Sequence, residues 1–91
     1  MTRSELEKLF RTPPAEYRPK PFWFWNGEMD RELIRRQLEE MADKGLGGAV
    51  ICARQGLTVP YLSQAWFDLV EAACGEAERL GLEIWLYDEY P

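Results

Sequence analysis

Residues 22–53 read FWFWNGEMDRELIRRQLEEMADKGLGGAVICA, and they carry the strongest signals of fold class in the chain. Its first four residues, Phe22–Trp25, are all aromatic, and no polar residue alternates with them. Such a run predicts a strand that is buried on both faces, which is typical of parallel sheets. The stretch ends on a second apolar run, Gly48–Ala53, which predicts a second buried strand.

The residues between these two runs predict a crossover helix. Over residues 30–44, apolar side chains recur at the three- and four-residue spacing of one helix face, and charged side chains fill the other face. Asp30 is a suitable N-cap, and Gly45 is a suitable left-handed residue at the C-terminal end. Two strands joined by such a helix form a parallel pair with a right-handed crossover.

The same pattern repeats toward the C-terminus. Ser63 is the predicted N-cap of a second helix that ends at Gly81, and residues 82–87 predict a third strand. The sequence therefore predicts an α/β fold with a β-α-β-α-β parallel unit. A dinucleotide-binding sheet carries its glycines after the first strand, whereas residues 45–48 carry theirs before the second strand. This position argues against a phosphate-binding turn and a dehydrogenase.

A separate lead-in is predicted at the N-terminus. Residues 4–11 have the spacing of a short amphipathic helix with Ser4 as its N-cap. Prolines at positions 13, 14, 19 and 21 argue against helix and interior strand in the following stretch. The predicted organisation is thus a helix and proline-rich lead-in over residues 1–21, and the α/β unit over residues 22–91.

Composition argues against several classes of function. The chain has 91 residues, a net charge of −5 and no histidine, so a Ser-His-Asp triad and imidazole-based zinc sites are excluded, and a nucleic-acid partner is not expected. Cys52 and Cys74 lie in apolar runs and are expected to be buried free thiols, and we expect no metal site and no cofactor. No apolar run approaches the ~20 residues of a membrane span, and residues 1–7 lack a signal-peptide core. A cytoplasmic protein without a membrane partner is the expectation.

Polar and aromatic side chains are concentrated where the predicted strands end. Asn26 follows the first strand, Arg54 the second, and Asp88 and Glu89 the third. Ligands of parallel α/β folds meet the carboxyl ends of the strands, so these residues are candidates for one binding site. Amide, guanidinium and carboxylate groups suit a sugar ligand. The alternative is that they are polar because loops are polar, and that residues 26–27 serve only as a turn.

No catalytic residue is assigned. Glycoside hydrolysis needs two carboxyl groups on either side of the scissile bond. Asp88 and Glu89 are neighbours in an extended segment, where successive side chains point to opposite faces, so they are not expected to form that pair. At most one of them would face the pocket.

Three motifs resemble one family of enzymes. Residues 21–29 (PFWFWNGEM), 40–48 (EMADKGLGG) and 85–91 (WLYDEYP) are similar to segments of the bacterial α-L-rhamnosidase-like glycoside hydrolases, as is the lead-in over residues 13–19. The resemblance implies the start of a (β/α)8 catalytic barrel in a much longer protein, with calcium near the active site of some members. It implies a general acid and base on later strands, so this chain would be an N-terminal fragment that is inactive alone. Asn26, Arg54, Asp88 and Glu89 would then line the substrate pocket.

Two further expectations follow from the small size of the sheet. The alternative to an enzyme fragment is a stand-alone α/β module that serves in binding or oligomerisation. A three-stranded sheet with helices on one face leaves the other face and both edges uncovered, and such surfaces recruit other chains. We therefore expect a homo-oligomer, with a homodimer as the simplest form.

Overall fold

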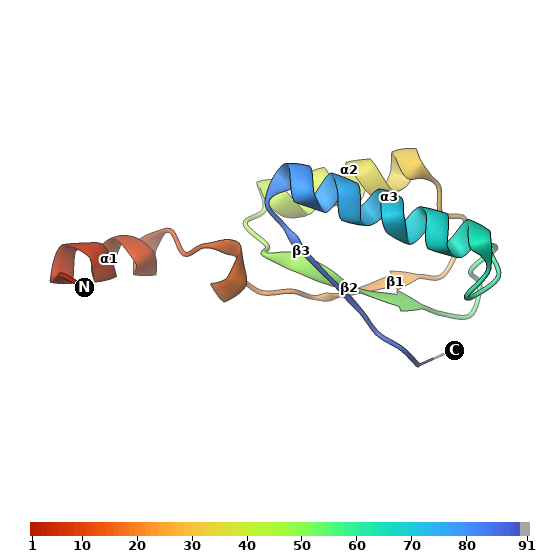
Figure 1. Cartoon of the computed structure of the whole chain (residues 1–91), viewed down its shortest axis with the longest axis horizontal. Coiled ribbons are helices and arrows are strands. Elements are labelled where there is room, and N and C mark those ends of the chain that lie inside the picture. Colours follow the sequence, from red (N-terminus) through yellow and green to blue (C-terminus); the bar gives the residue numbers. More distant parts are fainter. Residues whose placement is uncertain (90–91) are drawn as a thin grey trace.

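Three parallel strands alternate with helices in the computed structural model, which describes residues 1–89 (Figure 1). The elements are, in chain order, α1 (Arg3–Arg11), the short 3-10 helix η1 (Ala15–Tyr17), β1 (Phe22–Trp25), α2 (Arg31–Asp43), β2 (Gly48–Ala53), α3 (Gln64–Leu80) and β3 (Glu83–Leu86). The predicted α/β class, the β-α-β-α-β order and the short N-terminal helix are confirmed, and the arrangement is consistent with a partial barrel unit. The third strand is two residues shorter than predicted.

The sheet has the order β1-β2-β3, with both pairs parallel. The register aligns Phe22 with Val50, and Val50 with Trp85, so these three side chains share one face. Helices α2 and α3 both cover the opposite face (Figure 1). The buried core lies between that face and the helices and is made mainly of Trp23, Trp25, Ile34, Leu38, Ala49, Ile51, Trp66, Val70 and Ala73.

Most of the predicted helix ends are confirmed. Asp30 Oδ1 accepts a hydrogen bond from the Leu33 amide at 2.8 Å, and Ser63 Oγ accepts one from the Trp66 amide at 3.2 Å. Gly81 ends α3 with a φ of +72°, which glycine adopts at little cost. The prediction for α1 was wrong by two residues, because Thr2 is the N-cap there and forms a capping box with Glu5 in place of Ser4.

The sheet face opposite the helices is open. Along β1, Trp23 and Trp25 are buried beneath the helices, whereas Phe22 and Phe24 remain 60% and 48% exposed. Trp85 of β3 is 56% exposed. The prediction that β1 is buried on both faces was therefore wrong, because no described element covers the second face. The expectation that a three-stranded sheet leaves the face opposite its helices uncovered is confirmed.

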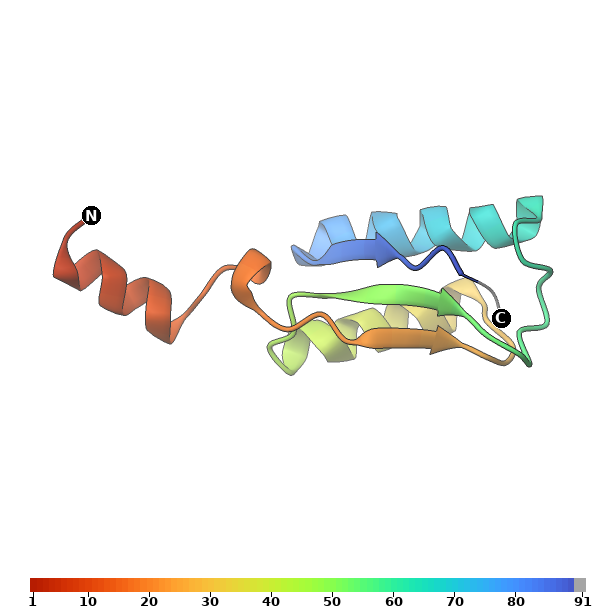
Figure 2. The same ribbon diagram turned by 90° about the horizontal axis from the view of Figure 1, so that it is seen from below.

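The lead-in is fixed to the sheet at the end opposite the carboxyl ends of the strands. The amide of Gly47 donates a hydrogen bond to the Pro19 carbonyl at 2.9 Å, and Lys20 Nζ lies 3.6 Å from a carboxylate oxygen of Glu83. A Cβ on Gly47 would overlap the carbonyl oxygen of Ala15, so only glycine allows this approach. Helix α1 then projects away from the α/β unit and buries none of its residues (Figure 2).

The two cysteines have different environments. Cys52 is buried in β2, and burial raises the pKa of its thiol. Cys74 is exposed on α3, so the prediction that both thiols are buried was wrong for this residue. Over residues 1–89, no group of three or more acidic or cysteine side chains could hold a metal ion, and no helix is long and apolar enough to cross a membrane.

Candidate functional site at the carboxyl ends of the strands

The loops after β1 and β2 and the segment after β3 lie at the same end of the sheet (Figure 2). Backbone hydrogen bonds hold the first two loops together. The amide of Arg54 donates to the Trp25 carbonyl at 3.1 Å, and the amide of Thr58 donates to the Gly27 carbonyl at 3.3 Å. Gly56, with a φ of +99°, lets the second loop pass over Asn26, because a Cβ there would overlap the Asn26 carbonyl oxygen.

Asn26 and Arg54, two of the predicted site residues, line one hollow. Phe24 and Gln55 complete its described lining. Asn26 follows Phe24 by two residues, and Arg54 follows Cys52 by two residues, so the strand alternation directs both toward the open face. The structure thus brings together the ends of β1 and β2, as the sequence predicts.

The Arg54 guanidinium lies against two aromatic rings. Its central carbon is 5.0 Å from the centroid of the Phe24 ring and 5.9 Å from that of the Tyr87 ring. Both distances fall within the range of cation–π attraction. Phe24 and Tyr87 were missed as site residues by the sequence analysis. The available sequence signal was strand alternation. Phe24 precedes Asn26 by two residues and Tyr87 precedes Glu89 by two residues, so each ring shares a face with a predicted site residue.

Glu89 is connected to this group through Tyr87. The phenol of Tyr87 donates a hydrogen bond to Glu89 Oε2 at 3.3 Å. The charge of Glu89, together with this hydrogen bond, raises the pKa of Tyr87 above its usual value. Phe22 packs edge-on against Tyr87, with 5.8 Å between ring centroids. Tyr87 therefore lies between Arg54 and Glu89 and contacts both groups.

Asp88 is held differently. Its backbone carbonyl accepts a hydrogen bond from the phenol of Tyr61 at 3.4 Å, while its side chain is exposed. This contact ties the segment after β3 to the loop after β2. Of the two neighbouring carboxylates, Glu89 is the one whose side chain contacts Tyr87, and Tyr87 in turn contacts Arg54. Tyr90, which the sequence also places after the third strand, lies outside the described residues.

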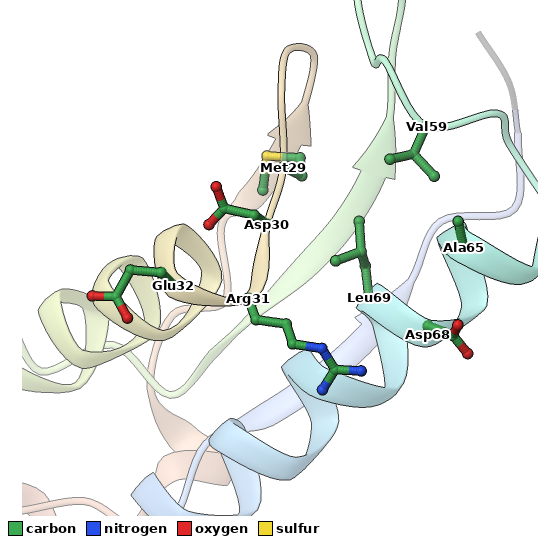
Figure 3. Close-up of a pocket in the computed structure, with 8 residues that line it drawn as sticks. All are labelled: Met29, Asp30, Arg31, Glu32, Val59, Ala65, Asp68 and Leu69. Atoms are coloured by element: carbon green, nitrogen blue, oxygen red, sulfur yellow. The ribbon is translucent and has the colours of Figure 1, made fainter.

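A second hollow lies on the helical side of the sheet, where α2 and α3 begin (Figure 3). Met29, Val59 and Leu69 form an apolar lining, and charged side chains surround it. The carboxylate of Asp30 already caps α2. This hollow holds none of the predicted site residues, and its features are those of two helix ends packed side by side.

Comparisons with known proteins agree on the family. Residues 11–89 match the alpha-L-rhamnosidase family of glycoside hydrolases. A protein of Formosa agariphila named "Putative beta-glucuronidase" is 32% identical over an alignment of 90 residues, and the match covers 93% of this chain and 8% of that protein. The solved structure of a rhamnosidase from Novosphingobium sp. PP1Y superposes on this chain with a TM-score of 0.79 at 32% identity. The match covers 93% of this chain and 9% of the rhamnosidase chain.

The match covers a small part of each relative but most of this chain. The chain spans less than a tenth of the length of either relative. Within that span, however, the family match includes all three strands and every predicted site residue. The chain therefore belongs to the alpha-L-rhamnosidase family of glycoside hydrolases.

Proposed function

We propose that the chain forms the opening β-α-β-α-β part of a (β/α)8 catalytic barrel and lines part of its sugar-binding pocket. The observation that carries this proposal is the position of Asn26 and Arg54 in one hollow at the carboxyl ends of β1 and β2. Active sites of such barrels lie at this end of the strands. The open sheet face would be the interior of the barrel, packed by side chains of the remaining strands.

The chemistry of the hollow supports a carbohydrate ligand. Asn26 offers a donor and an acceptor, Arg54 offers donors, and Glu89 offers acceptors, which together match the hydroxyl groups of a sugar. The exposed ring of Phe24 adds an apolar surface for the C–H face of the ring. A rhamnoside is the proposed substrate of the whole enzyme, and Asp88 is proposed to border the pocket.

The isolated chain is expected to release no p-nitrophenol from aryl glycosides, rhamnosides included. Hydrolysis needs a pair of carboxyl groups across the scissile bond. Asp88, the other proposed carboxylate, is the chain neighbour of Glu89 and is not expected to lie across the bond from it. The measurement is absorbance over many hours with highly purified protein. Turnover that Glu89→Gln abolishes would contradict this expectation.

A chimera tests the pocket itself. This chain would replace the matching segment of the Novosphingobium rhamnosidase, and kcat/KM for an aryl α-L-rhamnoside would be measured. Asn26→Ala removes neutral hydrogen bonds, each worth about 0.5–1.5 kcal/mol, and is expected to lower kcat/KM about 3- to 10-fold. Glu89→Gln removes a charged acceptor, worth about 1.5–3 kcal/mol, and is expected to lower it about 10- to 100-fold.

The matched control for this test is Gln64→Ala. Gln64 is an amide on α3 whose side chain bonds Asp68 at 2.9 Å, on the helical side of the sheet. Its removal should leave kcat/KM within about twofold of the chimera, as for surface changes remote from a site. If Asn26→Ala and Glu89→Gln behave like Gln64→Ala in a folded, active chimera, the proposed pocket is wrong.

A second candidate function is self-association, which the exposure of Phe22, Phe24 and Trp85 favours. At about 200 Å2 per aromatic side chain, their exposed parts amount to roughly 300 Å2, well below the ~800 Å2 that each partner buries in a standard interface. Helix α1 and the residue before its N-cap carry a second exposed apolar stripe, formed by Met1, Leu6, Leu9 and Phe10. We propose a homodimer in which α1 of each copy covers the open sheet face of the other, since the two surfaces together approach the standard size.

A further inference from the structure

We propose that the hollow around Arg54 binds a carboxylate on the sugar chain, and therefore that the substrate contains a uronic acid residue. This inference rests on the proposed sugar pocket and specifies the chemical class of one of its ligands. The first observation in its favour is the positive charge of the hollow. Arg54 is the sole charged residue among the described residues that line the hollow, although the chain as a whole has a net charge of −5.

The hydrogen-bonding groups of the hollow favour an acceptor. A guanidinium has five N–H donors and no acceptor, and the amides of Asn26 and Gln55 each add two N–H donors beside one acceptor oxygen. A carboxylate only accepts hydrogen bonds, and its two oxygens match the fork of an arginine. A neutral sugar hydroxyl has a single oxygen and carries no charge, so it would match the guanidinium of Arg54 less completely than a carboxylate does.

Arg54 is held in position from both its backbone and its side chain. Its amide bonds the Trp25 carbonyl, and its own carbonyl accepts a hydrogen bond from the Leu57 amide at 3.1 Å. The rings of Phe24 and Tyr87 lie 5.0 and 5.9 Å from the guanidinium carbon. A side chain that is already ordered loses less conformational entropy when it binds a ligand.

The nearby acidic group is itself engaged. Glu89 Oε2 accepts a hydrogen bond from Tyr87, which lies between Glu89 and Arg54. The Tyr87 phenol thus gives the Glu89 carboxylate a donor of its own. An incoming carboxylate would approach from the side of Asn26 and Gln55, where the lining is neutral.

The test is a titration of the 15N-labelled chain followed by amide NMR signals at pH 7 and constant ionic strength. The probes are methyl β-D-glucuronide, methyl β-D-glucoside, which has the same ring without the carboxylate, and methyl α-L-rhamnoside. We expect the glucuronide to shift the signals of Arg54 and Gln55 with an affinity at least about tenfold higher than that of the glucoside.

Two variants of Arg54 and one control variant locate the effect. Arg54→Gln removes the charge and should abolish the preference for the glucuronide, and Arg54→Lys keeps the charge without the fork and should retain only part of it. Arg36→Gln removes an exposed arginine on α2 and should leave the preference unchanged. The comparison of the three sugars on the unchanged chain stands even if Arg54→Gln fails to fold.

The outcomes separate the two proposals. If the glucoside and the rhamnoside shift the signals of Asn26 and Arg54 as strongly as the glucuronide does, the carboxylate inference is overturned and the sugar pocket is supported. If the glucuronide is preferred but its shifts map to the hollow between α2 and α3, the inference is overturned as well. If no sugar perturbs Asn26 or Arg54 at any concentration, both proposals are contradicted.

Discussion

Gly48→Ala is expected to prevent the chain from folding. Gly48 begins β2 with a φ of +155° and pairs with Glu83 of β3. A Cβ at this position would overlap the Glu83 carbonyl oxygen, which is a backbone atom and cannot move aside without displacing β3. A clash of this kind costs more than about 3 kcal/mol, which is a large part of the stability of a small domain. Circular dichroism during urea unfolding measures the effect.

Gly75→Ala is the matched control for this prediction. Gly75 lies inside α3, and a Cβ there would meet no atom within 4 Å. Alanine in a helix interior is more stable than glycine by about 0.5–1 kcal/mol, so this variant should unfold at a higher urea concentration than the unchanged chain. The account of Gly48 would be refuted by a Gly48→Ala variant with the unfolding midpoint of the unchanged chain.

The unchanged chain is expected to form dimers at micromolar concentration. At ~25 cal/mol per Å2, burying about 300 Å2 of the open sheet face on each of two copies contributes on the order of 15 kcal/mol, against an association cost of about 4–15 kcal/mol. The stripe on α1 adds a similar area and shifts this balance toward the dimer. Sedimentation equilibrium over a range of concentrations measures the dissociation constant.

Trp85→Lys and Phe67→Lys form a matched pair for the dimer. Trp85 lies on the open face and is 56% exposed, whereas Phe67 lies on α3 and is 48% exposed. A tryptophan at the centre of an interface contributes about 2 kcal/mol or more, so Trp85→Lys should raise the dissociation constant at least about 30-fold. Phe67→Lys should not change it. A well-folded chain that stays monomeric at ~100 µM would contradict the second candidate function.

The order of strands and helices could be predicted because the local signals agree with one another. The helical spacing in residues 30–44, the cap at Asp30 and the glycine at position 45 all indicate the same boundaries, and the structure has them within a residue. The start of α1 could not be predicted as well, because Thr2 and Ser4 are both good caps and each has a glutamate three residues later. Only the conformation decides between two such boxes.

Exposure was harder to predict than secondary structure. Phe22 and Phe24 have the side chains of a buried strand, but burial depends on whether another element covers their face, and sequence pattern within the strand does not contain that information. The error for Cys74 has a local cause. Its neighbours Ala73 and Ala77 face the core, and Cys74 is apolar enough to pass for a core residue although it points away from the sheet.

The end of the sheet that carries the candidate site could be predicted from the sequence, but the contacts between its side chains could not. The rule that ligands meet the carboxyl ends of parallel strands led to Asn26, Arg54 and Glu89. The rings of Phe24 and Tyr87 were missed because aromatic residues in a strand were assigned to the core. Their contact with Arg54 depends on the register of three strands, which the order of elements alone does not specify.

The attachment of the lead-in at the far end of the sheet has a practical consequence. Helix α1 and the N-terminus extend from one end of the molecule, which is 50 Å long, and the loops that carry Asn26 and Arg54 lie at the other end (Figure 1). A biotin on the N-terminal amine would therefore hold the molecule on a sensor surface with these loops facing the solution. The lead-in, which is hydrogen-bonded to the sheet at Gly47, would separate the sensor surface from these loops, so immobilisation would not obstruct the ligand.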